Sequence, residues 1–210
     1  MQLGKRRLPI FKQIKTRIMK TLSYAMLLVL FLIYEIPCEA QKRVGFFAGT
    51  NISSMRIDPP EIAKQRNRLI IGGFGSREIG RSVAYRYGLQ YIGKGADLDG
   101  IDANLSYVEL LFGLQVGASK ENGGIYLVGG FGIGLLASAR GRVPSVNADI
   151  KELFQAGELS YHGGIGIRIK NFFVEGLYQS SLISVVKDEY PAEAFNQGIQ
   201  LKAGLSFELW

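Results

Sequence analysis

The chain has 210 residues, 47% of them hydrophobic, with 27 glycines, 10 tyrosines and a formal net charge of +7. Of its 25 basic and 18 acidic side chains, seven and two lie within residues 1–40. The rest of the chain keeps 18 and 16, so it lacks the basic surplus of a nucleic-acid-binding domain. This glycine- and tyrosine-rich composition is typical of one strand-rich domain and argues against a helical enzyme.

Residues 1–40 have the order of a secretory signal peptide. A basic region precedes the uncharged run 21–34, and Cys38-Glu39-Ala40 ends the segment in a small-x-small pattern. The run has 14 residues, whereas a membrane-spanning helix needs about 20. Cleavage is therefore favoured over a membrane anchor, and Met19 is a candidate for the true start. We expect residues 41–210 to form the mature domain, which has no cysteine for a disulfide or a thiolate metal site.

From residue 41 onward, apolar and polar residues alternate with the period of a β-strand. The pattern predicts eight strands, at 44–53, 68–76, 82–92, 105–117, 124–137, 156–169, 172–182 and 197–210. Their connections have 14, 5, 12, 6, 18, 2 and 14 residues, so long and short ones alternate. Alternate connections of an up-and-down barrel lie at opposite ends. The sequence thus predicts an all-β fold, an eight-stranded antiparallel up-and-down transmembrane β-barrel with long outer loops and short periplasmic turns.

The stretch YLVGGFGIGLLA (126–137) tests this interpretation, because it contains four glycines. A dinucleotide-binding loop needs G-x-G-x-x-G where a strand leads into a helix. Here Gly130, Gly132 and Gly134 are separated by single residues, so in a strand they share one face. Glycines in that arrangement indicate that a facing group comes close. We expect a crowded barrel interior rather than a cofactor site.

Alternation alone does not separate a membrane barrel, whose apolar face points outward, from a soluble barrel, whose apolar face points inward. Three features favour the outward arrangement: glycines on the polar face, charges of both signs that can pair inside a narrow tube, and tyrosines on the apolar face, as at a membrane interface. The charged positions are Arg86, Glu109, Arg168, Glu175, Lys202 and Glu208. A soluble sheet is the alternative.

Five segments resemble, in order and spacing, the outer-membrane β-barrel family that includes the PorT-like proteins. They are VGFFAGTNISS (44–54), YGLQYIGKGA (87–96), LSYVELLFGLQV (105–116), YLVGGFGIGLLASA (126–139) and GIQLKAGLSFELW (198–210). The resemblance implies an eight-stranded barrel in a Gram-negative outer membrane and, through PorT itself, an association with secretion. It implies no set of functional residues. Leu111 stands where the family commonly has proline, and Trp210 has the parity of the polar face rather than the apolar face usual for a terminal aromatic residue.

His162 is the only histidine of the chain and lies on the polar face. As a general base it would suit a lipid-acting barrel enzyme. No serine–carboxylate arrangement accompanies it in the sequence, so we expect a histidine inside the barrel, hydrogen-bonded to a carboxylate. A single histidine also excludes a multi-histidine metal site.

Two loops have charge patterns that resemble binding sites. Asp97, Asp99 and Asp102 are spaced like calcium ligands, but the glycine and glutamate that complete a calcium-binding loop are missing. We expect an acidic, solvated surface loop. The cationic stretch SARGRVP (138–144) is expected to be an ordinary polar loop, with contact to anionic lipopolysaccharide as the alternative.

The leading hypothesis is a small non-enzymatic barrel of the cell outer membrane, with an interior plugged by side chains and long extracellular loops. Its role would be structural, binding or secretion-accessory, and its partners the lipid bilayer, lipopolysaccharide and envelope or secretion proteins. We predict no catalytic, cofactor-binding or metal-binding residues. A wide channel conflicts with eight strands. The alternatives are a lipid-acting barrel enzyme that uses His162 and a soluble periplasmic ligand-binding barrel.

Overall fold

The computed structural model describes residues 42–58, 63–80, 82–98, 101–117, 123–143, 146–187, 189 and 193–209. The predicted signal peptide and Trp210 therefore lie outside the described residues. Eight long strands run through the described part: β1 (Lys42–Asp58), β3 (Arg66–Glu78), β4 (Val83–Leu98), β5 (Ile101–Gly117), β6 (Gly123–Val143), β8 (Gly157–Ile169), β9 (Phe172–Ser181) and β10 (Glu193–Leu209). Two short strands, β2 (Ala63–Lys64) and β7 (Val146–Asp149), and a 3₁₀ turn, η1 (Lys151–Leu153), accompany them.

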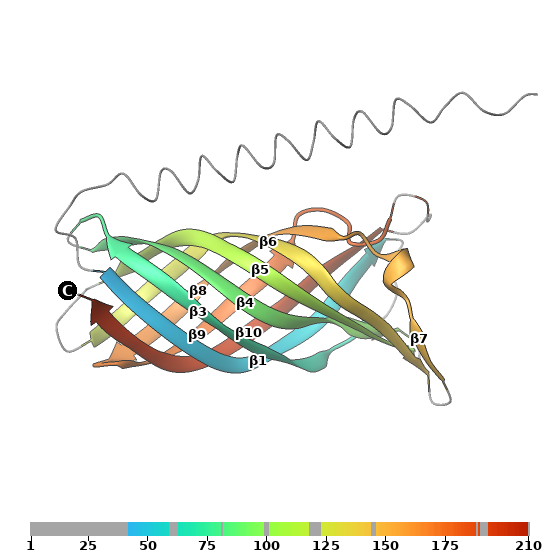
Figure 1. Cartoon of the computed structure of the whole chain (residues 1–210), viewed down its shortest axis with the longest axis horizontal. Helices are drawn as coiled ribbons and strands as arrows, with labels where there is room; N and C mark the ends of the chain where they lie inside the picture. Colours follow the sequence, from blue (N-terminus) through green and yellow to red (C-terminus); the bar gives the residue numbers. More distant parts are fainter. Residues whose placement is uncertain are drawn as a thin grey trace, which may run out of the picture. The chain divides into compact units, whose positions relative to one another are not determined.

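The long strands form a closed antiparallel barrel, in which they tilt strongly against the long axis (Figure 1). Each strand pairs with the next long strand along the chain, and the ring closes where β10 pairs with β1. This closing seam runs from Lys42 opposite Leu209 to Asp58 opposite Glu193 without a register shift. β2 adds to the end of β4, and β7 to the end of β6. The predicted eight-stranded up-and-down barrel is confirmed.

The two ends of the barrel differ in their connections. At one end, the turn end, β1 begins and β10 ends, and the strands are joined by residues 79–82, 118–122 and 170–171. The opposite end, the loop end, carries β2, β7 and η1 (Figure 1). The predicted two-residue turn at Lys170 and Asn171 is confirmed, and Lys170 has the positive φ of 54° that such a tight turn requires.

At the loop end the strands are longer than predicted. β4 continues to Leu98 and β5 starts at Ile101, so the predicted 12-residue connection 93–104 is wrong, and two residues separate the strands. β6 continues to Val143 and forms a hairpin with β7 within the predicted connection 138–155. The alternation ends before the strands do because backbone pairing needs no apolar face once a strand has left the hydrophobic belt. Gly95, with φ 110°, keeps its pairing with Asn104 although it breaks the pattern.

Along most of the barrel the apolar side chains point outward and the polar ones inward. On β6, Leu127 and Phe131 are each 59% exposed, whereas Tyr126 and Val128 on either side of Leu127 are buried. The outward residues that form this hydrophobic belt come from all eight long strands, including Phe46, Leu69, Leu89, Leu110, Leu127, Ile165, Val174 and Leu205. The inward arrangement that defines a soluble barrel is absent from these strands.

Gly130, Gly132 and Gly134 of β6 face the interior, and groups of neighbouring strands occupy the space that they leave. A Cβ at Gly132 would lie 2.9 Å from the Ser160 hydroxyl, and one at Gly134 would lie 3.3 Å from Glu109 Cγ. On β8, a Cβ at Gly166 would lie 2.4 Å from the Tyr126 ring. The expectation of a facing group close to this glycine run is confirmed.

Among the described residues, no helix has the length and hydropathy to cross a membrane.

Candidate functional site

The barrel interior holds charged side chains in two clusters, which the inward parity of the strands brings together. In the first cluster, nearer the turn end, Arg86 of β4 forms an ion pair with Glu175 of β9. The Tyr126 hydroxyl of β6 donates to the same carboxylate over 2.8 Å. The Arg86 guanidinium lies 3.5 Å from the centre of the Phe74 ring, a cation–π contact. Two other strands, β4 and β6, therefore supply partners to one buried carboxylate of β9.

The second cluster lies nearer the loop end and is centred on Lys94 of β4. Its ammonium lies between two carboxylates, Glu109 of β5 and Glu158 of β8, at 2.5 and 2.8 Å. Ser181 and Asn196 donate to Glu158. One cation thus faces two anions, and neutral donors supply the remaining hydrogen bonds, as buried charges require.

Amide side chains extend the second cluster to Lys202, which lines the same cavity as Arg86 and Glu175 of the first cluster. Gln90 donates to Glu109 over 2.7 Å and accepts from Lys202 over 3.0 Å. Gln179 donates to Glu109 over 3.2 Å and to the Ser160 hydroxyl over 2.7 Å, and it accepts from Gln200. We call the two clusters and these amides the interior network. It connects β4, β5, β6, β8, β9 and β10 across the tube.

Above the interior network, at the loop end, the buried side chains are apolar. Met55, Leu105, Leu136, Phe154 and Val185 are the loop-end part of a hydrophobic cluster that also includes Phe47, Phe74 and Phe173 further along the barrel; we call these five residues the loop-end cluster. The segments after η1 and β9 hold it in place, because Phe154 bridges Val186, the Gln155 N–H donates to the Val185 carbonyl over 2.8 Å, and the Val185 N–H donates to the Ala194 carbonyl over 2.7 Å. Apolar side chains thus cover the polar interior on this side.

The spaces left between these side chains are small. A cavity lined by Arg86, His162, Glu175 and Lys202 has a volume of about 20 Å³, enough for a water molecule. A ligand pocket for a small molecule is commonly 300 Å³ or more, as an order of magnitude. The described interior therefore accommodates solvent rather than a substrate.

His162, the candidate general base, lies in this interior and is 8% exposed. Its Nδ1 atom has no hydrogen-bond partner, so the expected hydrogen bond to a carboxylate is not present at that nitrogen. Ser160, the inward serine nearest to it in sequence, is bonded to Gln179 and to the Gly132 carbonyl instead. Among the residues with described positions, the hydrogen bonds bring no serine–histidine pair together.

The acidic loop 97–102 is a hairpin in the structure. Asp97 forms an ion pair with Arg66, and Asp102 forms one with Arg68, whereas Asp99 lies outside the described residues. Asp97 is 7% exposed, so the expectation of a solvated acidic loop is wrong for this residue. Within the described ranges, no group of three or more histidine, cysteine, aspartate or glutamate side chains has the arrangement of a metal site.

The cationic stretch 138–144 belongs largely to β6 and does not form a free loop. Arg140 is exposed and stands opposite Asp149 of β7 in the hairpin. An acidic neighbour therefore offsets the charge that sequence alone suggested as available for lipopolysaccharide.

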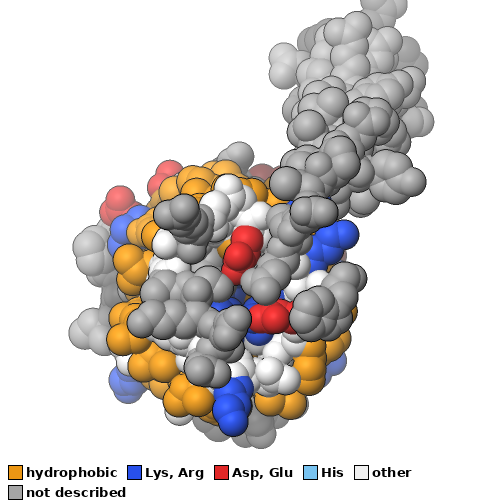
Figure 2. Space-filling model, turned by 90° about the vertical axis from the view of Figure 1, so that its left-hand side faces the viewer, with side chains coloured by type: hydrophobic (Ala, Val, Ile, Leu, Met, Phe, Trp, Pro, Cys, Tyr) orange, Lys and Arg blue, Asp and Glu red, His pale blue; other side chains and the backbone are white. Residues whose placement is uncertain are grey.

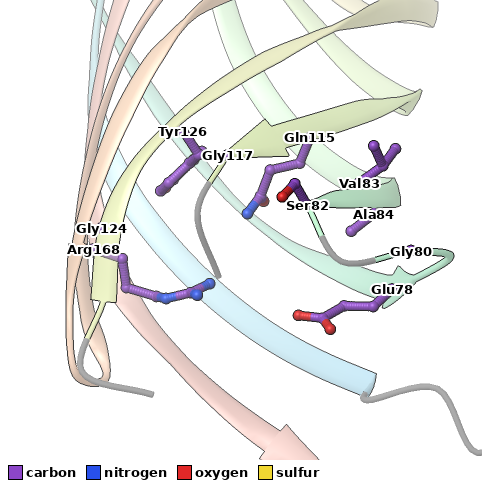
Figure 3. Close-up of a pocket in the computed structure, with 10 residues that line it drawn as sticks. All are labelled: Glu78, Gly80, Ser82, Val83, Ala84, Gln115, Gly117, Gly124, Tyr126 and Arg168. Carbon is purple, nitrogen blue, oxygen red and sulfur yellow. The ribbon is translucent and has the colours of Figure 1, made fainter. Parts of the chain in front are cut away.

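The mouth of the barrel at the turn end contains a second cavity of about 20 Å³. We call it the mouth pocket; Glu78, Ser82, Gln115, Tyr126 and Arg168 line it (Figure 3). Figure 2, which looks onto this end, shows acidic and basic side chains in the mouth and hydrophobic side chains around it. Arg168 is 9% exposed and extends into the opening, opposite Glu78.

Sequence reasoning found part of this arrangement. It placed Arg86, Glu109, Glu175 and Lys202 on the inward face, which is confirmed. It missed Lys94, because the residue was assigned to a loop. Lys94 lies four residues after the inward Gln90 and has the same parity. Had the predicted strand extended beyond residue 92, the parity would have placed Lys94 in the interior.

The sequence matches no protein-family model, and no curated protein matches it significantly. Solved structures do resemble the barrel. Neisserial surface protein A is 10% identical, with a TM-score of 0.51, and the match covers 79% of this chain and 97% of that protein. Ail of Yersinia pestis, solved in complex with the heparin analogue sucrose octasulfate, is 15% identical with a TM-score of 0.46, over 81% of this chain and 100% of Ail.

The N-terminal β-barrel domain of Pseudomonas aeruginosa OprF is 14% identical with a TM-score of 0.42, over 80% of this chain and 100% of that domain. At these identities the likeness concerns the fold. The match to Neisserial surface protein A agrees with the eight-stranded barrel described above.

Proposed function

We propose that the protein is a small, non-enzymatic β-barrel of a Gram-negative outer membrane, exported by a signal peptide that is cleaved after residue 40. One observation carries the proposal: the hydrophobic belt surrounds a polar, ion-paired interior. In water, so many exposed apolar side chains would cause association. In a bilayer they meet hydrocarbon, while the closed barrel satisfies every strand edge.

The proposed placement sets the direction of the barrel. Barrels of this class have short turns on the periplasmic side and longer loops outside. The turn end then faces the periplasm, and the loop end, with its hairpins, faces the exterior and the lipopolysaccharide layer. The resemblance to PorT-like proteins supports a secretion-accessory role among the structural and binding roles that this placement allows.

We further propose that the interior is plugged and conducts no ions at a rate useful to the cell. Two properties support this: the small size of the two cavities described above, about 20 Å³ each, and the loop-end cluster above the interior network. Both also speak against the alternatives. A soluble ligand-binding barrel needs an apolar cavity inside, and a lipid-acting enzyme needs His162 where an acyl chain can reach it, whereas His162 is enclosed.

The membrane placement is tested by comparing boiled and unboiled detergent-solubilised protein on a gel, together with carbonate extraction of cell envelopes. We expect faster migration of the unboiled protein and retention in the carbonate-insoluble fraction. Release by carbonate without any shift in migration would contradict the placement. Planar-bilayer recordings test the plug separately, and a steady conductance from the folded protein would contradict it while leaving the placement intact.

A further inference from the structure

We propose that the mouth pocket is a docking site for an acidic peptide segment of a partner protein, and that Arg168 binds its carboxylate. The inference rests on the proposed function for the side of the membrane on which the partner lies. In that placement the mouth opens to the periplasm, so the partner is a periplasmic protein or domain.

Arg168 lacks a carboxylate partner among the described residues. Its side chain is buried, yet it forms neither a hydrogen bond nor an ion pair with any described residue. Two other inward arginines near this end have carboxylate partners: Arg43 pairs with Glu208, and Arg86 pairs with Glu175. Its guanidinium extends into the mouth without a carboxylate partner, so an anionic ligand can reach it.

Basic side chains outnumber acidic ones among the described residues around the mouth pocket. Of the described side chains within two residues of the turn-end limit of a long strand, five are basic and two are acidic: Lys42, Arg43, Arg77, Arg168 and Lys170 against Glu78 and Glu208. Glu208 is occupied by Arg43, and Glu78 has an interaction of its own. Glu78 and Glu208 offset part of the positive potential at Arg168 without forming an ion pair with it, and the surplus of basic side chains among the described residues still attracts anions.

The size of the mouth pocket limits the ligand that can enter it. The free space is about 20 Å³, which fits a flat carboxylate group but not a sugar ring or a lipid. The guanidinium can bind both carboxylate oxygens side by side. Gln115 and Ser82 lie on the same opening and offer uncharged donors (Figure 3). Lipid phosphates, in contrast, lie outside the ring of strands.

The experiment measures the anisotropy of a fluorescent hexaglutamate peptide with the detergent-solubilised full chain. We compare Arg168→Gln with Lys42→Gln, which removes the same charge from the same end but outside the pocket. A hydrogen bond to a charged group contributes about 1.5–3 kcal/mol, so we expect Arg168→Gln to weaken binding roughly 10- to 100-fold. For Lys42→Gln we expect less than about a threefold loss. Arg168→Lys keeps the positive charge but loses the paired N–H donors of the guanidinium, so its loss of affinity should lie between those of the other two variants.

Three results would overturn the inference. One is the absence of saturable binding to the unmutated protein up to about 1 mM peptide, the weakest affinity of interest. The second is an equal loss in Arg168→Gln and Lys42→Gln, which indicates attraction by overall charge. The third is displacement by inorganic phosphate at the concentration at which free glutamate displaces the peptide, which indicates a general anion site. The gel comparison on each variant tests the barrel itself, so the failures of the two proposals are distinguishable.

Discussion

The interior of this barrel changes character along its axis. At the level of the hydrophobic belt, the inward side chains include the ion pairs and amides of the interior network, and the outward ones are apolar. At the loop end the inward side chains are apolar, as in the loop-end cluster, and exposed charges such as Arg56, Asp149 and Lys151 lie outside. The loop end therefore has apolar side chains inside and charged ones outside, as a soluble protein has. The belt region has the opposite arrangement. In the proposed placement, the level at which the pattern inverts is the boundary between lipid and water.

The largest effect is expected from breaking the interior network at its single shared cation. Lys94→Met leaves Glu109 and Glu158 buried without their counter-ion. Removing one partner of a buried ion pair costs about 3–5 kcal/mol of unfolding free energy. Urea unfolding in lipid vesicles, followed by the fraction of heat-shifted protein on a gel, measures the loss.

Arg66→Met is the matched control for that change, because Arg66 pairs with Asp97 at the loop end and its side chain is 45% exposed. There we expect a change below about 1 kcal/mol. Equal losses in the two variants would show that the interior network is no more important than a surface ion pair.

The loop-end cluster is tested by Phe154→Ala. This side chain is 7% exposed and packs in the cluster, and truncation of a buried phenylalanine costs about 3 kcal/mol or more. Tryptic cleavage in the connections around η1 should become faster, while the belt strands stay protected. A variant that is cleaved no faster than the unmutated protein would contradict a packed core at this end.

A charge placed on the outer face distinguishes the two regions directly. Ile165→Lys puts a cation in the hydrophobic belt, where Ile165 is 51% exposed, and should cost about 2 kcal/mol in a bilayer. Leu153→Lys makes the same kind of change at η1, where Leu153 is 37% exposed, and should change stability by less than about 0.5 kcal/mol. Vesicle unfolding measures both, and a neutral Ile165→Lys would refute contact of the belt with lipid.

The smallest effect is expected for an added methyl group inside the tube. In Gly166→Ala the new Cβ meets the Tyr126 ring at 2.4 Å, which should cost about 1–2 kcal/mol as the ring shifts away from Glu175. Gly163→Ala on the same strand points outward, where the nearest atom is 3.8 Å away, and we expect stability within about 0.5 kcal/mol of the unmutated protein. A reversed order would mean that the parity of β8 is wrong.

The sequence predicts the barrel well because its main signals are local. Period-two alternation, the inward glycines and the tight turn at Lys170 each depend on a few neighbouring residues, and all are confirmed. The loop end is predicted poorly. There the strands carry no apolar outer face, so Lys94 and Asp97 looked like loop residues, although backbone pairing extends the hairpin past them.

The candidate sites depend on contacts that the sequence does not encode locally. Parity places Arg86 and Glu175 on inward faces, but it does not specify that they meet, since 89 residues separate them. Nor does it show that Arg168, with the same parity, lacks the carboxylate partner that Arg43 finds in Glu208. Such pairings depend on the tilt of the strands and the shear of the barrel. Together these determine which residues of distant strands lie at the same level along the barrel axis.

The seam between β1 and β10 has a consequence for biogenesis. It joins the first strand of the barrel to the last over 17 residues of each, so no shorter product of translation can close the ring. Until β10 arrives, β1 and β9 each present an unpaired edge to any strand nearby. Closure of the ring therefore requires the C-terminal strand, which makes β10 a checkpoint for completeness.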